Sequence, residues 1–330
     1  MNAATAATSA LLVALCGQLA VAPVAAQGLR GLFGKTITGE LAPGERLEKL
    51  TVDGVEREYI VHPPPGFPGK RRWPLVLLFH GGAGNAGQAL EHYGMRNAAD
   101  RRGFLLVAPN GTGRSVLRTW NVKFGFGYAK DNDVDDVGFV RALLARLEST
   151  LPIDTRRVFA TGISNGGMLC HFVAAGLPGS FAAIAPVVGS YGGKAPDQDR
   201  WQTPPPPTAP VSVMAFNGGK DDHVPLEGGR QRKSIGTAVE VKSAAETARF
   251  WTTADGCAAA ARVTEDTARG VTIHRFTGGR AGTEVELWVI HDQGHAWPGG
   301  KSPRLQADAP STRVDATELM WDFFERHPRR

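Results

Sequence analysis

The sequence predicts an α/β protein built on one doubly wound, mostly parallel sheet, and two observations support this prediction. Short apolar runs alternate along the chain with longer segments whose apolar residues recur at helical spacing. Continuous apolar runs are typical of parallel strands, because helices cover both faces of such strands. Right-handed crossovers then bring the carboxyl ends of the strands to one edge, where the functional residues of such sheets gather.

The expected elements follow one another in the order that this sheet requires. Residues 48–62 alternate between apolar and polar side chains, which predicts one or two early antiparallel strands. Apolar runs predict later strands at 74–79, 104–108, 157–161, 181–188, 211–216 and 283–290. Helical spacing predicts helices at 88–101, 134–150, 167–175, 239–252 and 312–326. The four prolines at 204–207 lie between two predicted strands and indicate a stiff loop.

The N-terminal residues 1–26 have the features of a secretory signal peptide. An apolar stretch over residues 10–21 is followed by small residues at 24–26, so cleavage is expected before Gln27. The stretch is interrupted and too short for a transmembrane anchor. We therefore expect a secreted protein, extracellular or periplasmic, in which residues 27–330 form a single domain.

Composition argues against a nucleic-acid partner. The net charge is +5 and the pI is about 9.2, but basic and acidic residues are interspersed without the aromatic and basic pattern of a nucleic-acid surface. Two cysteines, Cys170 and Cys257, remain after cleavage. An oxidising compartment permits a disulfide between them, but Cys170 on a predicted buried helix is equally consistent with an inert thiol.

The sequence GISNG at residues 162–166 is the most informative motif. It follows a strand-like run and opens into a predicted helix, the context in which G-x-S-x-G forms a nucleophile elbow. The serine of such an elbow sits in a strained turn, and larger side chains in place of the glycines would collide with the neighbouring strand and helix. Ser164 is therefore the predicted nucleophile of a serine hydrolase.

A serine hydroxyl needs a base, and the base needs an acid that orients it. The chain order Ser, Asp, His is expected for this sheet type. Asp221 follows the strand ending near 216 and is the first choice for the acid, with Asp222 in reserve. His295 lies in a glycine-flanked loop after the last strand and is the first choice for the base.

Three other histidines are weaker candidates for the base than His295. His291 is nearer the last strand and is the reserve base. His171 lies on the elbow helix and is expected to face away from the nucleophile. His223 neighbours the predicted acid and is assigned at most to the pocket lining.

The oxyanion hole is predicted from a second glycine-rich turn. The sequence HGGAG at residues 80–84 directly follows a central apolar strand and is similar to the HGGG-type loop, whose backbone N–H groups point into the site. Gly82 is expected to supply one donor and Asn165, the residue after the nucleophile, the other. The turn is not a phosphate loop, because no Lys-Ser or Lys-Thr pair follows it.

No metal or cofactor is predicted. The acidic segment 131–136 has the 1-3-5 spacing of a calcium loop, but Asp136 stands where that loop needs glycine and Ala142 where it needs glutamate. The segment is interpreted as an acidic helix N-terminus. No His or Cys spacing of a zinc site is present.

Taken together, the motifs resemble those of secreted esterases grouped with poly(3-hydroxybutyrate) depolymerases and feruloyl or acetylxylan esterases. The resemblance spans residues 27–330 and depends on HGG at 80–82, WN at 120–121, VDDVGF at 134–139, GISNGGM at 162–168, Asp221 before VP at 224–225, GHAWPG at 294–299 and WDFF at 321–324. It implies an α/β-hydrolase catalytic domain with the triad Ser164, Asp221 and His295 and no cofactor. It also implies that Trp120, Asn121 and Trp297 line the substrate pocket.

Two departures from the family pattern bear on the substrate. Residues 217–219 read Asn-Gly-Gly where the family often has His-Gly-Thr, and residues 124–126 read Phe-Gly-Phe where it often has a cysteine pair. No linker or granule-binding module is visible in the sequence, which favours soluble esters or oligomers over solid polymer. The expected substrates are hydroxyalkanoate oligoesters or the feruloyl and acetyl esters of plant cell walls.

Two other functions remain open at this point. A serine peptidase on the same fold would use the same triad, although the chain shows no gating domain. A non-catalytic polysaccharide-binding protein on a hydrolase scaffold would be expected to lose the nucleophile, which is present here.

Overall fold

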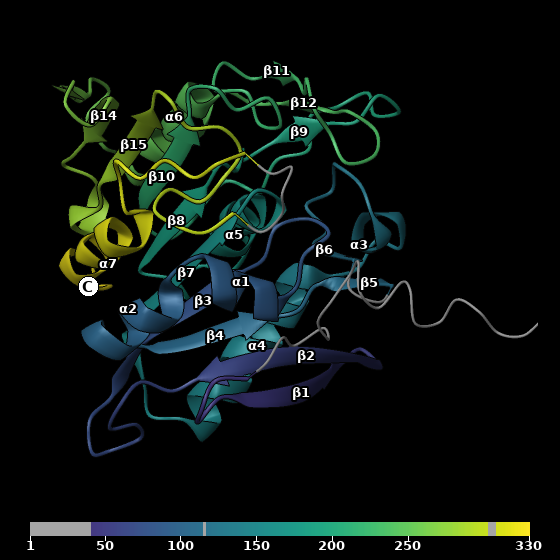
Figure 1. Cartoon of the computed structure of the whole chain (residues 1–330), viewed down its shortest axis with the longest axis vertical. Helices are drawn as coiled ribbons and strands as arrows, with labels where there is room; N and C mark the ends of the chain where they lie inside the picture. The colour runs from purple at the N-terminus through teal and green to yellow at the C-terminus, as the bar shows by residue number, and fades with distance from the viewer. Residues whose placement is uncertain (1–40, 115–116, 303–307) are drawn as a thin grey trace, which may run out of the picture. The chain divides into compact units, whose positions relative to one another are not determined.

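The computed structural model describes residues 41–330 except 115–116 and 303–307 (Figure 1). The predicted signal segment at 1–26 therefore lies outside the described residues. Within the described part of the chain, no helix is long and apolar enough to cross a membrane.

Among the described residues, ten strands form one sheet in the order β1-β2-β4-β3-β7-β8-β10-β15-β14-β13. The central strands from β4 to β15 pair in parallel, and antiparallel strands flank them on both sides. The prediction of a doubly wound, mostly parallel sheet is therefore confirmed. The strands are β1 (Arg46–Val52), β2 (Val55–His62), β3 (Trp73–Phe79), β4 (Leu105–Pro109), β7 (Ile153–Ile163), β8 (Ala183–Val187), β10 (Ser212–Gly218), β13 (Arg262–Asp266), β14 (Val271–Phe276) and β15 (Val285–Ile290).

Helices cover both faces of this sheet, and a hydrophobic cluster lies beneath each layer (Figure 1). α4, α5 and α6 pack on one face, and α1, α2 and α7 pack on the other. Leu75 and Leu77 of β3 belong to the first cluster and Val76 to the second, because successive side chains of a strand point to opposite faces. The helices are α1 (Ala86–His92), α2 (Met95–Arg102), α3 (Tyr128–Asp131), α4 (Asp136–Thr150), α5 (Asn165–Gly176), α6 (Ala244–Asp255), the 3-10 turn η1 (Arg280–Gly282) and α7 (Ala316–Arg326).

Three predicted helices differ from the observed ones, and the one expected at 312–326 begins only at α7, after its cap Asp315. The helix expected at 88–101 is two helices, because Gly94 adopts a left-handed φ of 73° between α1 and α2. The helix expected at 239–252 begins only at α6, where Ser243 and Glu246 form a reciprocal capping box. The residues before this cap instead form the short strand β12 (Glu240–Val241).

Several short strands in the loops were not predicted from the sequence. These are β5 (Thr112–Arg114), β6 (Leu117–Thr119), β9 (Gly193–Lys194) and β11 (Gly229–Arg230), which with β12 form two small sheets. Strands of two or three residues carry too little periodicity to be predicted. The exposed hairpin of β13 and β14 was missed because its side chains do not alternate cleanly.

The two described cysteines are free thiols. Cys170 is buried in α5, where burial raises its pKa well above the usual value. Cys257 is partly buried after α6 and its pKa is also raised by burial. The structure therefore contains the inert thiol at Cys170 rather than the disulfide.

Candidate active site

Ser164 occupies a strained turn between β7 and α5. Its backbone angles are φ 55° and ψ −122°, a conformation that costs a residue with a side chain about 1–3 kcal/mol. Two backbone hydrogen bonds hold the turn: Ser164 N–H donates to the carbonyl of Val187 at 2.9 Å, and Met168 N–H donates to the carbonyl of Ser164 at 2.7 Å. The elbow thus presents a partly exposed serine at the start of a helix.

Close backbone approach explains the glycines on either side of the elbow. A Cβ on Gly162 would lie 2.6 Å from the carbonyl oxygen of Phe79, and one on Gly166 would lie 2.5 Å from that of His80. Real Cβ atoms do not approach backbone oxygens so closely. The spacing of the motif is therefore set by β3, which runs beside β7.

The structure brings Asp221 and His295 into direct contact. Asp221 Oδ2 accepts a hydrogen bond from His295 Nδ1 at 2.8 Å, and Asp221 Oδ1 accepts from the backbone N–H groups of His223 at 2.7 Å and Val224 at 2.8 Å. Because a carboxylate only accepts, Nδ1 of His295 carries the hydrogen and Nε2 is free to act as a base. The reserve acid Asp222 instead forms ion pairs with two cations, Arg232 and Lys233.

A second carboxylate, which the sequence analysis missed, supports the histidine loop. Asp308 Oδ2 accepts a hydrogen bond from the backbone N–H of His295 at 2.7 Å. A Cβ on Gly294 would lie 2.3 Å from the same oxygen, so a larger residue there would displace this carboxylate. Asp308 lies outside every predicted element, and no sequence signal marks it.

His291 and His171 contact other partners than the triad residues. His291 is exposed, and its Nε2 contacts Thr272 Oγ1 at 2.8 Å, away from the triad. His171 is fully buried, accepts a hydrogen bond from Trp251 Nε1 at 2.9 Å and lies 3.2 Å from the carbonyl of Gly189. Burial lowers the pKa of His171 to about 4, so this ring is a neutral link between α5 and α6.

The three predicted triad residues share the carboxyl edge of the sheet, since Ser164, Asp221 and His295 follow β7, β10 and β15. In the described part of the chain, no hydrogen bond joins Ser164 Oγ to His295. Such catalytic hydrogen bonds often form only when substrate is bound.

The turn that follows β3 lies against the elbow. A Cβ on Gly81 would lie 3.8 Å from Cβ of Ser164, and one on Gly82 would lie 3.5 Å from Cβ of Asn165. Ala83 and Gly84 use their N–H groups in hydrogen bonds to Arg118 and Gly81. No described residue accepts from the N–H of Gly82, so this donor remains available to a ligand.

His80 and Trp120 form a rigid support under this turn. Trp120 Nε1 donates to the carbonyl of His80 at 2.9 Å, and Gly111 N–H donates to His80 Nε2 at 3.0 Å. His80 Nδ1 lies 2.8 Å from the carbonyl of Gly81 and therefore carries the hydrogen. Burial lowers the pKa of His80 to about 4, so the ring stays neutral.

The structure corrects the predicted pocket wall. Trp120, Asn121 and Trp297 are 0%, 4% and 2% exposed, so they support the site from the core rather than line it. Trp297 stacks on Tyr93 at 4.5 Å and donates to Thr317. A buried aromatic and a wall aromatic look alike in sequence, because both are large and apolar.

Two side chains near the triad have more exposed surface than these three. Phe126 is partly exposed, and its Cζ would lie 2.8 Å from a Cβ on Gly82. His223 is also partly exposed, and its ring packs on that of His295 with centroids 4.7 Å apart. Phe126 lies in the segment 124–126, where the sequence departs from the family pattern, and His223 adjoins the predicted acid.

The acidic segment before α4 is structural. Asp135 caps α4 by accepting from the N–H of Gly138, and buried Asp136 pairs with Arg57 at 2.6 Å. Asp133 bonds Lys123 and Asn121. The described residues contain no group of three or more metal-ligating side chains.

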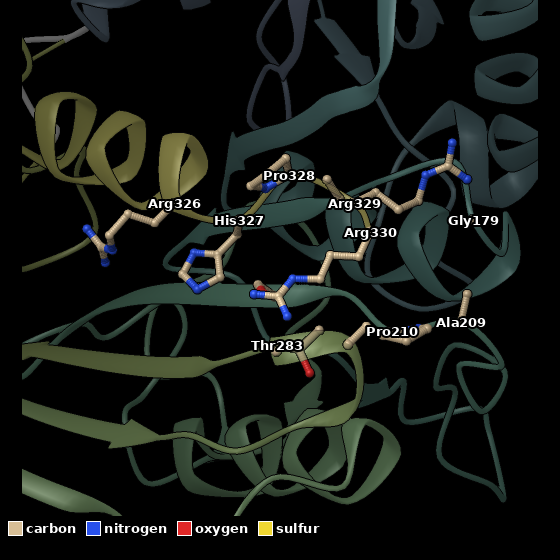
Figure 2. A pocket seen from close by; sticks show the side chains of 13 residues that line it. Gly179, Ala209, Pro210, Thr283, Arg326, His327, Pro328, Arg329 and Arg330 are labelled. Carbon is tan, nitrogen blue, oxygen red and sulfur yellow. The ribbon is translucent and has the colours of Figure 1, made fainter.

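A cavity of about 250 Å³ lies away from the triad, at the opposite edge of the sheet (Figure 2). Figure 2 shows its lining by the segment from Arg326 to Arg330 together with Gly179, Pro210 and Thr283, which precede β8, β10 and β15. Because ligands of open α/β sheets bind at the carboxyl ends of the strands, this cavity is not the substrate site.

Comparisons with known proteins place the chain among esterases. Residues 57–197 match the family model described as Esterase PHB depolymerase. The protein named "Putative esterase NocK" of Nocardia uniformis subsp. tsuyamanensis is 29% identical over 294 residues, which cover 83% of this chain and 81% of that protein. Feruloyl esterase B of Piromyces equi is 26% identical over 245 residues, 74% of this chain and 44% of that protein.

A solved structure shows the same fold. The acetyl xylan esterase from Aspergillus awamori aligns with a TM-score of 0.56 at 14% identity, over 84% of this chain and 99% of that chain. The likeness, together with the strand order, identifies the α/β-hydrolase fold.

Proposed function

We propose that this chain, an ester hydrolase whose residues 57–197 match the Esterase PHB depolymerase family model, acts through a Ser-His-Asp acyl-enzyme mechanism. The observation that carries the proposal is the 2.8 Å hydrogen bond between Asp221 and His295 at the sheet edge that holds the Ser164 elbow. A nucleophile, an oriented base and unused N–H donors at one edge are the parts that acyl transfer requires.

In the proposed reaction, Ser164 Oγ attacks the ester carbonyl while His295 Nε2 takes its proton. The N–H groups of Gly82 and Asn165 stabilise the resulting oxyanion, each by about 3 kcal/mol. The intermediate collapses as His295 returns the proton to the leaving alcohol. Water then attacks the acyl-enzyme with His295 as base, and the acid is released.

For the substrate, we favour hydroxyalkanoate oligoesters or plant cell-wall feruloyl and acetyl esters. The family description and the names of the relatives support this range. Acid release from methyl ferulate and from soluble 3-hydroxybutyrate oligomers, measured side by side, would separate the two classes. Secretion belongs to the same proposal and predicts an exported protein whose first residue is Gln27.

A fluorophosphonate probe tests the mechanism, because it reacts only with an activated serine. The parent protein should be labelled and Ser164→Ala should not be. Ser149→Ala, which changes an exposed serine on α4, is the matched control and should be labelled like the parent. Equal labelling of parent and Ser164→Ala would contradict the assignment of the nucleophile.

A further inference from the structure

His223 is held beside the proposed base by the same carboxylate that orients the base. Its backbone N–H donates to Asp221 Oδ1 at 2.7 Å, while Asp221 Oδ2 holds His295. The two imidazole rings lie with centroids 4.7 Å apart at an angle of 36°. The amide of Gln231 donates to the carbonyl of His223 at 2.7 Å, so the backbone is fixed from both sides.

The ring nitrogens of His223 are not used by the fold. Neither has a hydrogen-bond partner among the described residues, and the side chain is only partly buried. Burial, followed by the electrostatic effect of the neighbouring His295 ring, lowers the pKa of His223, although Asp221 and Asp308 oppose the shift. A neutral imidazole offers one N–H donor and one acceptor, the pair that a hydroxyl group can bind.

The chemistry of ester cleavage fixes which half of the substrate lies near this ring. The carbonyl oxygen must face the N–H groups of Gly82 and Asn165, and the leaving oxygen must come within hydrogen-bond reach of His295 Nε2. The alcohol half therefore lies on the histidine side. A side chain packed on His295 is placed to meet that half.

We propose that His223 binds the leaving alcohol and favours alcohols that carry a hydroxyl group next to the ester oxygen, as in acylated polyols and sugars. This inference rests on the catalytic roles proposed for Ser164 and His295. The ring of Phe126 lies against Gly82, so an apolar side chain borders the turn that carries the proposed oxyanion donor. His223 thus supplies a polar contact where the alcohol leaves.

Two butyrate esters of equal chain length test the proposal. The alcohol half of 1-glyceryl butyrate carries a neighbouring hydroxyl, and that of propyl butyrate does not. The parent should hydrolyse the glyceryl ester with the higher kcat/KM. His223→Phe keeps a ring against His295 but removes both nitrogens, and should lower the glyceryl-to-propyl ratio about 3–10-fold, the effect of one lost hydrogen bond.

Two further variants complete the experiment. His291→Phe makes the same change at an exposed histidine outside the site and should keep the parent ratio. His223→Gln restores a donor and an acceptor and should recover part of the preference. Fluorophosphonate labelling of Ser164 in each variant shows whether the nucleophile is still activated.

Two outcomes would overturn the role of His223. The first is a parent ratio near one. The second is an unchanged ratio in His223→Phe; if both esters then fell by the same factor, His223 would be a positioning residue for His295 only. Failure of the underlying mechanism is separate, because it would appear as ester hydrolysis that survives Ser164→Ala.

Discussion

The side-chain amide of Asn165 forms two hydrogen bonds with the backbone of Trp120. Asn165 Oδ1 accepts from Trp120 N–H at 2.7 Å, and Asn165 Nδ2 donates to the Trp120 carbonyl at 3.0 Å. Trp120 in turn bonds the carbonyl of His80, at the start of the turn that carries Gly82. The residue after the nucleophile is therefore tied to the support of the other proposed oxyanion donor.

The two hydrogen bonds between Asn165 and Trp120 predict that Asn165→Ala lowers both stability and activity. The backbone N–H of residue 165 remains, but both side-chain bonds are lost and two buried groups of Trp120 lose their partners. We expect the free energy of unfolding to fall by about 1–3 kcal/mol and kcat to fall more than KM changes. Thermal unfolding and steady-state kinetics on one soluble ester measure both. An unchanged kcat would show that the hydrogen bonds between Asn165 and Trp120 do not position the turn that carries Gly82.

Replacing the proposed acid should remove most of the activity without unfolding the protein. Asp221→Asn puts a side chain that can donate opposite His295 Nδ1 and favours the wrong tautomer, so kcat should fall about 10³–10⁴-fold. Asp222→Asn is the control, since Asp222 pairs with Arg232 and Lys233 at the surface. If the control lost as much activity as Asp221→Asn, the choice of acid would be wrong.

Two glycines of α5 should respond differently to the same methyl group. In Gly166→Ala the Cβ would lie 2.5 Å from the backbone oxygens of His80 and Phe79, which cannot move aside without shifting β3. We expect a loss of about 1–3 kcal/mol of stability together with most of the activity. In Gly176→Ala the Cβ would meet only the side chain of Val137 at 3.2 Å, and the change should stay within about 1 kcal/mol.

Asp255 predicts a pH-dependent change in stability. The residue is fully buried, its Oδ1 accepts from Val211 N–H at 3.1 Å, and its Oδ2 has no partner in the described structure. Burial raises its pKa from 3.8 to about 7. Because the folded pKa is the higher one, the protonated form favours folding at low pH, and stability falls as pH rises from about 4 to about 7.

Asp255→Asn removes this titration while keeping the oxygen that Val211 needs. The variant should be more stable than the parent by about 1–3 kcal/mol at pH 8, and the difference should shrink towards pH 4. Denaturant unfolding at several pH values measures this difference in stability. Asp199→Asn, which makes the same change at an exposed aspartate, is the control. A stability difference that does not vary with pH would contradict a buried, titrating Asp255.

The sequence alone predicted the sheet class, the helices of both layers and the position of the elbow. These features depend on residues that are close together in the sequence. They are apolar runs of five or six residues, apolar residues repeated at helical spacing, and the G-x-S-x-G turn at Ser164. The break at Gly94 and the start of α6 at Ser243 were missed because one glycine and one cap interrupt otherwise helical patterns.

Contacts between distant segments were decided only by the tertiary structure. Asp221 and His295 are 74 residues apart, and they meet because β10 and β15 are neighbours in the sheet. The same strand order places His223 on His295 and brings Asp308 to its backbone, which no local pattern indicates. Sequence determines what a side chain can do, whereas the strand order and register determine which other side chains it can reach.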